Sequence, residues 1–250
     1  MGVTTESHGD ARIRVLTLSN PGKLNAIDDE VRGELAREVA SAAADATCRV
    51  IVITGADRAF SSGGELSGMP TEPDAIRRRM GTLHGIIRTL AEAPQIVIAA
   101  VDGVAFGSGL SLAAAADVVV AGNGARFGCT FGRVGLIPDV GFMWTVPRRI
   151  GVRRARLMVL QNAIIDAPEA LHWGLADISS PEGGALEHAV ELAARIARTP
   201  AATLASAKRM LTTTYSTLDA VLEDELSSQI ELLGTVEFDE ARRAFLSRSK

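Results

Sequence analysis

Two short runs of apolar, mostly β-branched or small residues constrain the fold of this chain more than any other feature. One run is Val50-Ile51-Val52-Ile53-Thr54, and the other extends from Ile96 to Val101. An uninterrupted run of this kind is typical of a strand buried on both faces, as in a sheet that is covered by helices. Helical patterns alternate with these strands along the chain, so the sequence predicts an α/β core.

The second half of the chain has a different character, because helical patterns dominate it. Helices are expected over residues 186–198, 201–215, 218–233 and 238–249. A further helical pattern covers about 140–173 and is expected to be interrupted at Pro147. We therefore predict an α/β core over residues 1–198 and a C-terminal helical region over residues 199–250. No linker of disordered composition separates these parts, so they are expected to pack together.

The composition excludes several classes of protein. Hydrophobic residues make up 47% of the 250 residues, which is far too high for a disordered chain. The net charge is −4 and aromatic residues are only 4%, whereas nucleic-acid binding asks for basic patches and stacking platforms. Two cysteines, Cys48 and Cys129, cannot build a disulfide framework, so a reducing cytoplasm is expected.

The sequence predicts neither a signal peptide nor a membrane span. The first ten residues have no basic segment followed by an apolar one. The longest apolar stretch, from Ile96 to Val120, is interrupted by Asp102 and Asp117, whereas a spanning helix needs roughly 20 uninterrupted apolar residues. This stretch is therefore expected to form buried strands and turns, with no membrane partner.

Two turns of small residues are the candidate functional segments. The first, Ala59–Leu66, contains Gly63 and Gly64, and the second, Gly103–Gly109, precedes a helical pattern. Glycine lets the backbone approach a ligand closely, and the start of a helix has free N–H groups that favour negative charge. If the two turns converge, their N–H groups can form an oxyanion hole. The alternative is that both are only tight connections between a strand and a helix.

Other nucleotide-binding and nucleophile motifs do not fit the second turn. A dinucleotide-binding G-x-G-x-x-G motif would need glycine at Leu112, and a phosphate-binding loop would need a nearby lysine. A nucleophile elbow around Ser108 would need glycines at Phe106 and Leu110. Ser108 is therefore expected to contribute its main-chain N–H group.

These turns belong to a series of motifs that resembles the crotonase superfamily, the enoyl-CoA hydratase/isomerase proteins, over essentially the whole chain. The matching segments are Asn20–Ala26, Ala59–Leu66, Ile98–Gly109, Ala116–Val118, Ala125–Gly128, Val134–Asp139 and Ala170–Ala176. The resemblance implies a crotonase-like spiral of ββα units, with a C-terminal helical trimerisation region and a homotrimer or hexamer. It also implies acyl-CoA thioester substrates, with coenzyme A as part of the substrate and no metal or redox cofactor.

The resemblance assigns the oxyanion-hole donors to the N–H groups of Gly64 and Ser108. Hydratases of this family use two glutamates to handle water, and Ser111 and Phe131 stand at those two positions. Neither side chain is a carboxylate, which puts a hydratase mechanism with paired carboxylates in doubt.

One carboxylate, Asp139, stands where the double-bond isomerases of the superfamily keep an aspartate. The resemblance therefore implies an acyl-CoA isomerase in which Asp139 removes a proton and returns it two carbons away. Phe131, Leu136, Phe142 and Trp144 are expected to line the acyl pocket, and burial there would raise the pKa of Asp139. Four alternatives remain open: a helix-capping role for Asp139, a hydratase with an unusual site, a nucleophilic aspartate as in 4-chlorobenzoyl-CoA dehalogenases, and a non-catalytic acyl-CoA-binding protein.

For coenzyme A itself, the resemblance points to main-chain groups in two segments and to one basic side chain. The residues concerned are Lys23, Leu24 and Ala26, then Glu65 and Leu66, and finally Arg248. The run Arg77-Arg78-Arg79 is expected to be a solvated helix face.

Overall fold

The computed structural model describes residues 1–9 and 11–248, and it contains a main sheet with the spatial strand order β1-β2-β3-β4-β6-β9. The strands are β1 (Gly2–His8), β2 (Ile13–Ser19), β3 (Val50–Gly55), β4 (Ile96–Val101), β6 (Val118–Gly122) and β9 (Ile178–Ser180). Strand β1 pairs antiparallel with β2, and the other neighbouring strands are parallel. The sequence did not predict β1, because this edge strand is mostly exposed or half-buried and has no apolar run.

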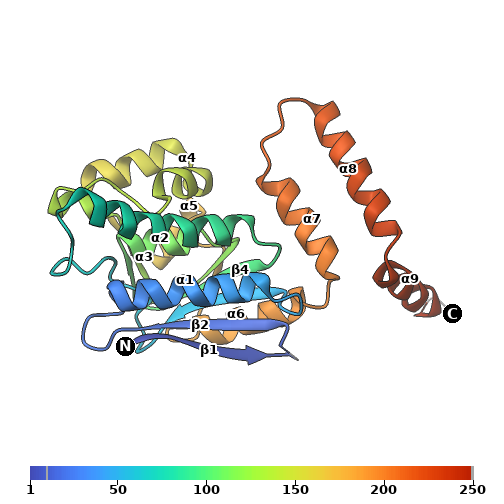
Figure 1. The fold of residues 1–250 in the computed structure, drawn as a ribbon, viewed down its shortest axis with the longest axis horizontal. Helices are drawn as coiled ribbons and strands as arrows, with labels where there is room; N and C mark the ends of the chain where they lie inside the picture. The colour runs from blue at the N-terminus through green and yellow to red at the C-terminus, as the bar shows by residue number, and fades with distance from the viewer. Residues whose placement is uncertain (10, 249–250) are drawn as a thin grey trace.

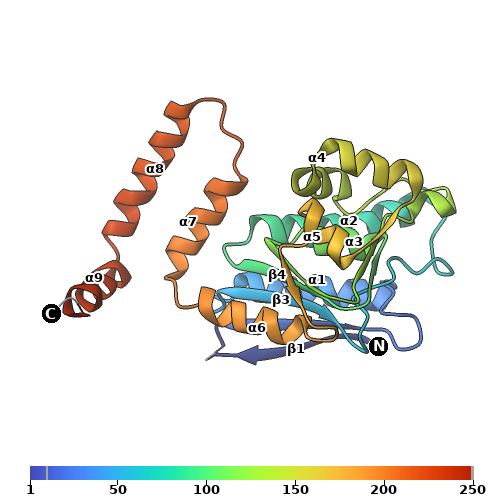
Figure 2. The ribbon, with the colours of Figure 1, turned by 180° about the vertical axis from the view of Figure 1, so that it is seen from behind.

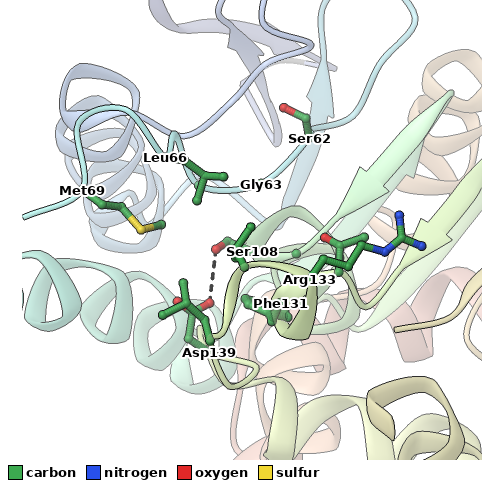
Figure 3. Close-up of a pocket in the computed structure, with 13 residues that line it drawn as sticks. Ser62, Gly63, Leu66, Met69, Ser108, Phe131, Arg133 and Asp139 are labelled. Carbon is green, nitrogen blue, oxygen red and sulfur yellow. Dashed lines mark hydrogen bonds between the residues drawn. The ribbon is translucent and has the colours of Figure 1, made fainter. Parts of the chain in front are cut away.

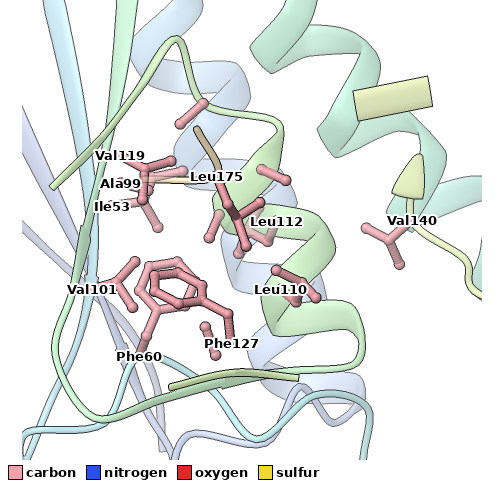
Figure 4. Close-up of a cluster of buried hydrophobic side chains, with 14 of the residues drawn as sticks. Ile53, Phe60, Ala99, Val101, Leu110, Leu112, Val119, Phe127, Val140 and Leu175 are labelled. Atoms are coloured by element: carbon pink, nitrogen blue, oxygen red, sulfur yellow. The ribbon is translucent and has the colours of Figure 1, made fainter. Parts of the chain in front are cut away.

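The central strands are buried on both faces, as their apolar runs predict. In β3, Ile51 and Ile53 join the larger hydrophobic cluster, while Val50 and Val52 join a second cluster on the opposite face. The helices α1 (Asp29–Ala44), α2 (Pro73–Glu92) and α3 (Ser108–Ala114) contribute to the larger cluster, and α6 (Ala185–Ile196) contributes to the second. Figure 4 shows Phe60 and Phe127 between the sheet and α3 in the larger cluster.

A smaller sheet builds the repeated units of the spiral. Its strands, in spatial order, are β5 (Val104–Phe106), β7 (Arg126–Gly128) and β8 (Ile164–Asp166). The chain passes from β4 to β5 and then to α3, and later from β6 to β7 and then to α4 (Phe142–Gln161). After β3, Ser61 makes an isolated parallel bridge with Ala105 in β5, and α2 follows. This succession confirms the predicted spiral of ββα units.

The long helical pattern in the middle of the chain is divided differently from the expectation. Pro147 lies inside α4, and the break comes at Gly151, whose φ of 77° and ψ of 153° are not helical. Glycine adopts this backbone conformation at little cost, so the helix breaks there. Strand β8 then separates α4 from α5 (Ala167–Trp173).

The C-terminal helices extend away from the α/β core (Figures 1 and 2). They are α7 (Ala201–Thr212), α8 (Leu218–Leu233) and α9 (Val236–Arg248). Helix α7 reaches the core through Lys208, whose Nζ donates to the carbonyl groups of Leu90 and Gln95 and pairs with Asp117. Helices α8 and α9 lie beyond the core, so within this chain the expected packing of the two parts is made by α7.

The surface of α8 explains why this helix lies beyond the core. Its apolar side chains recur every three or four residues and are at least half exposed: Leu218, Leu222, Leu226, Ile230 and Leu233. A helix with such an apolar face is stabilised by packing against another surface, and the core of the same chain does not supply it.

Among the described helices, none is long and apolar enough to cross a bilayer.

Candidate active site

The two glycine-rich turns lie side by side. The N–H of Ser61 donates to the carbonyl of Val104 at 2.9 Å, and the N–H of Phe106 donates to the carbonyl of Ser61 at 2.9 Å. Gly63 has a φ of 100°, and a Cβ atom there would lie 2.7 Å from the carbonyl oxygen of Phe106. Glycine is therefore required at this contact, both for its backbone conformation and for space.

Two backbone N–H groups remain available at this junction. In the bridge between Ile27 and Gly64, the hydrogen bonds use the carbonyl of Gly63 and the N–H of Glu65, which leaves the N–H of Gly64 outside the pairing. Ser108 is the first residue of α3, so its N–H has no helical acceptor. Within the described part of the chain, neither N–H donates to a protein acceptor.

Both turns border a cavity of about 190 Å³. Much of its wall is apolar, from the side chains of Leu66, Met69, Phe131, Val134 and Leu136. Figure 3 shows Leu66 and Met69 on one side of the cavity, with Phe131 and Asp139 on the other. Asp139 is the one carboxylate among the described residues that line it.

Asp139 is held in the cavity by a short, strained turn. Val140 has a φ of 52°, and Gly141, with a φ of 77°, is the N-cap residue of α4. The carbonyl of Asp139 accepts from the N–H of Phe142 at 3.1 Å, while its carboxylate accepts from the Ser108 hydroxyl at 3.1 Å (Figure 3). The side chain of Asp139 therefore does not cap α4, which removes the capping alternative.

The electrostatic surroundings of Asp139 act in opposite directions. Burial raises its pKa above the ordinary value, because a low-dielectric surrounding disfavours the charged carboxylate. The hydrogen bond from Ser108 and the charges of Arg79 and His84 lower the pKa, and the net shift is upward. A carboxylate with a raised pKa is a stronger base once it is ionised.

The two positions that correspond to hydratase glutamates have different surroundings. Phe131 lines the cavity and packs edge-on against Phe142, with ring centroids 6.3 Å apart. Ser111 is fully buried one turn inside α3, and its hydroxyl donates to the carbonyl of Gly107 at 3.3 Å. Phe131 thus gives the cavity an apolar wall, and Ser111 is not among the lining residues.

Two of the expected pocket aromatics lie elsewhere. Phe142 is part of the buried core, and Trp144 is 57% exposed, with the guanidinium of Arg148 3.1 Å from its ring centroid. Successive helical residues are rotated by about 100°, so a residue two positions after the inward-facing Phe142 points outward. The expectation that Trp144 lines the pocket is therefore wrong for the single chain.

The segments expected to hold coenzyme A meet beside Ser62, a cavity residue whose N–H donates to the carbonyl of Leu24 at 2.8 Å. Lys23 forms a salt bridge with Glu65, which raises the pKa of Lys23 and, together with Ser67, lowers the pKa of Glu65 to about 2. Leu24 and Leu66 are exposed, whereas Ala26 is buried and donates its N–H to the carbonyl of Lys23 at 3.1 Å. The side chain of Arg248 lies outside the described residues.

The sequence interpretation missed four residues of this region: Met69, Thr130, Arg133 and Arg79. Arg133 lines the cavity from a short 3-10 helix, Phe131–Val134. Met69 and Thr130 line the cavity but lie in loops without a recognisable pattern. Arg79 is only 9% exposed, although Arg77 and Arg78 are exposed as expected. A signal was present for Arg79, because it continues the buried helical series of Leu83, Ile86 and Leu90.

Comparisons with known proteins agree with this geometry. The family described as enoyl-CoA hydratase/isomerase matches residues 8–250. The chain is 32% identical over 248 residues to 1,2-epoxyphenylacetyl-CoA isomerase from Escherichia coli, covering 97% of this chain and 95% of that protein. It is 34% identical over 238 residues to 2,3-dehydroadipyl-CoA hydratase from the same organism, covering 95% and 93%.

A solved structure of an enoyl-CoA hydratase from Polaromonas sp. JS666 superposes with a TM-score of 0.92 at 30% identity, covering 99% of this chain and 98% of the other. The match extends through the spiral and the C-terminal helices together, because almost the whole of both chains is included. On this agreement of sequence, fold and paired turns, the chain belongs to the enoyl-CoA hydratase/isomerase family of the crotonase superfamily.

Proposed function

We propose that this enzyme binds an unsaturated acyl-CoA and shifts its double bond, with Asp139 as the single acid/base. The observation that carries the proposal is the position of Asp139, the one carboxylate among the described cavity residues, beside Ser108 at the start of α3. The similarity to a protein named 1,2-epoxyphenylacetyl-CoA isomerase supports the same class of reaction.

The reaction starts from a thioester whose carbonyl oxygen accepts hydrogen bonds from the N–H groups of Gly64 and Ser108. With a 3-enoyl-CoA, Asp139 takes a proton from C2, and the electrons of the broken C–H bond form a C1–C2 double bond as the carbonyl oxygen becomes negative. Asp139 then returns the proton to C4, the C2–C3 double bond forms and the carbonyl is restored. Preorganised N–H donors stabilise the negative charge where it develops, typically by about 3–4 kcal/mol for each donor.

Hydration needs more than this site offers, because water must be held and activated as well as a proton delivered. Phe131 and Ser111 supply no carboxylate for that task. A hydratase with an unusual site is the second candidate, and the similarity to a protein named 2,3-dehydroadipyl-CoA hydratase favours it. The position of Trp144 outside the cavity weakens the comparison with an aryl-halide site, which would surround a ring with aromatic side chains.

We further propose that coenzyme A binds across the two segments joined by the Lys23–Glu65 salt bridge, with main-chain contacts from Leu24, Ala26 and Leu66. In this proposal the exposed apolar face of α8 packs against other copies of the chain in a trimer or hexamer.

The test is an assay of the purified enzyme with 3-enoyl-CoA and with 2-enoyl-CoA, following the absorbance of the conjugated thioester and the formation of 3-hydroxyacyl-CoA. Isomerisation that is lost in Asp139→Asn supports the proposal. Rapid hydration of 2-enoyl-CoA that survives this substitution contradicts it and favours the hydratase. Tight acyl-CoA binding without turnover favours a non-catalytic acyl-CoA-binding protein.

A further inference from the structure

Arg79 on α2 is a largely buried cation that borders two small clefts and has little compensation from neighbouring charges. Its side chain is 9% exposed, and its nearest carboxylate is Asp29, whose Oδ1 lies 3.7 Å from Nη1. Asp29 is itself 79% exposed and makes its shorter contact, 2.8 Å, with Nη2 of Arg32. No hydrogen bond joins the guanidinium of Arg79 to another described residue. Burying a charged group is costly unless it is paired, so this arrangement needs an explanation.

The guanidinium points toward the paired turns of the active site. Its Nη2 lies 3.0 Å from the position of a Cβ atom on Gly64, and the Ser108 hydroxyl oxygen lies 3.7 Å from the same point. The Ser108 hydroxyl in turn donates to Asp139 at 3.1 Å. One fixed positive charge is thus close to the Gly64 backbone and to the carboxylate that faces it across Ser108.

The electrostatic influence acts in both directions. Burial and the charge of Arg32 lower the pKa of Arg79, while Asp29 and Asp139 act against this lowering. Arg79 in turn lowers the pKa of Asp139 against the effect of burial. Two groups of neighbouring charges act on this pair: His84 on α2 acts on Asp139, and Asp29 and Arg32 on α1 act on Arg79. Arg133 also lines the cavity of Asp139, and Arg79 shares a cleft with charged side chains of both signs: Lys23, Asp28, Glu30 and Glu65. Because an arginine side chain stays charged at all ordinary pH values, its field on the site is constant.

We propose that Arg79 is a positioning residue, whose buried charge keeps Asp139 ionised before proton transfer and stabilises the enolate oxygen at Gly64 afterwards. This inference rests on the proposed function. During the reaction one negative charge moves from the carboxylate to the thioester oxygen, and a fixed cation near both positions stabilises it without rearrangement. Arg79 does not line the cavity itself, so it acts through Gly64, Ser108 and Asp139.

The experiment compares Arg79→Met with Arg78→Met, which removes the same charge from the exposed neighbouring position. Two readouts are measured: the acid limb of the pH profile of kcat/KM, and the titration midpoint of the Asp139 carboxyl by 13C NMR. In Arg79→Met both midpoints are expected to rise by roughly one pH unit and kcat to fall at least about tenfold. Arg78→Met is expected to leave the two midpoints and kcat unchanged. Arg79→Lys is expected to keep both midpoints and kcat close to the wild-type values.

A second variant keeps the test decisive where Arg79→Met does not fold. Asp29→Asn removes an exposed carboxylate from the neighbourhood of Arg79, and the midpoint of Asp139 is expected to move downward. An unchanged NMR midpoint in folded Arg79→Met, or in Asp29→Asn if only that variant folds, overturns the inference. If the wild-type enzyme isomerises no enoyl-CoA while the NMR midpoints shift as described, the proposed function fails and the effect of Arg79 on Asp139 stands.

Discussion

The hydroxyl of Ser108 donates a hydrogen bond to Oδ1 of Asp139 at 3.1 Å. The same residue contributes the N–H group at the start of α3, so one residue supplies both a proposed oxyanion donor and a contact to the proposed base. This contact fixes the distance between the two groups of the proposed mechanism, the carboxylate that would remove the proton and the N–H group that would stabilise the negative charge. Substitution of Ser108 by alanine can distinguish the roles of its two groups, because it removes the side-chain hydroxyl and keeps the main-chain N–H.

Ser108→Ala is expected to raise the acid-limb pKa of kcat/KM by roughly one to two units. A hydrogen bond to a charged group contributes about 1.5–3 kcal/mol, and one pKa unit corresponds to about 1.4 kcal/mol. The main-chain N–H remains, so activity at high pH should stay within about tenfold of wild type. Ser111→Ala, on the same helix but bonded to the Gly107 carbonyl, is the matched control and should leave the pH profile unchanged. A Ser108→Ala profile that superposes on wild type contradicts the coupling.

Asp139→Asn is expected to reduce isomerisation by roughly 10²–10⁴-fold, the usual contribution of a general acid/base. The same substitution should raise the free energy of unfolding at pH 7. Because folding raises the pKa of Asp139, the folded protein binds the proton more readily than the unfolded chain, and stability falls as pH rises from the unfolded to the folded pKa. That loss persists at neutral pH, and asparagine avoids it while still accepting the bond from Ser108.

Urea denaturation at pH 7 and near pH 3 measures this effect on stability. The gain from Asp139→Asn should be present at pH 7 and should shrink below the ordinary aspartate pKa of about 3.9, where the wild-type carboxyl is protonated in both states. A variant that is less stable than wild type at pH 7 would show that the ionised carboxylate is net stabilising.

The sequence could predict the parts of the fold that depend on local pattern. The run Val50–Thr54 identified a two-sided buried strand, and the resemblance carried by the series of motifs implied the spiral. It could not predict β1, whose residues face solvent, or the break at Gly151, where φ and ψ depend on the packing of α4. The position of Asp139 outside α4 depends on the left-handed turn at Val140 and Gly141, which no pattern marks.

For the site too, residue type and motif identify some residues, whereas helix boundaries and packing decide the position of others. Gly64, Ser108 and Asp139 stand out by residue type and motif, and the structure brings their backbones to one cavity. Trp144 points away from the cavity because α4 begins at Phe142, two residues later than the predicted start near 140, and Phe142 is the residue that faces the core. Arg79 was overlooked because a run of three arginines indicates a solvated face, although its spacing from Leu83 places it on the buried side.

The two adjacent glycines of the first turn should respond differently to alanine. In Gly63→Ala the new Cβ would lie 2.7 Å from a backbone oxygen at a φ of 100°, so we expect a loss of about 1–3 kcal/mol of stability. In Gly64→Ala the nearest atoms are the ends of Arg79 and Met69, at 3.0 and 3.2 Å, which can move. Denaturation and kinetics on both variants should show lost stability for Gly63→Ala and a near-wild-type fold with reduced kcat for Gly64→Ala. Equal destabilisation of the two would contradict this assignment.

Lys208 is expected to hold α7 on the core. Its ammonium group is buried and lies 2.9 Å from Asp117 and within 2.9 Å of the carbonyl oxygens of Leu90 and Gln95. Lys208→Met leaves these acceptors without their cation, and losing one partner of a buried pair costs about 3–5 kcal/mol. Hydrogen exchange in residues 201–212 should accelerate, and the free energy of unfolding should fall. Arg195→Met, which removes an exposed charge from α6, is the control, and unchanged exchange in α7 of Lys208→Met would contradict the role.

Helix α8 should supply an interface between copies of the chain. Its leucine and isoleucine side chains form one apolar face that is at least half exposed, and a single chain of 26.3 kDa does not cover it. Light scattering coupled to size-exclusion chromatography should therefore give three or six times this mass. Leu226→Glu places a charge on the apolar face and should dissociate the assembly, whereas Ser227→Glu adds the same charge away from that face and should not. A wild-type protein that is monomeric at micromolar concentration, or a Leu226→Glu variant that keeps the full mass, would require a different partner for this surface.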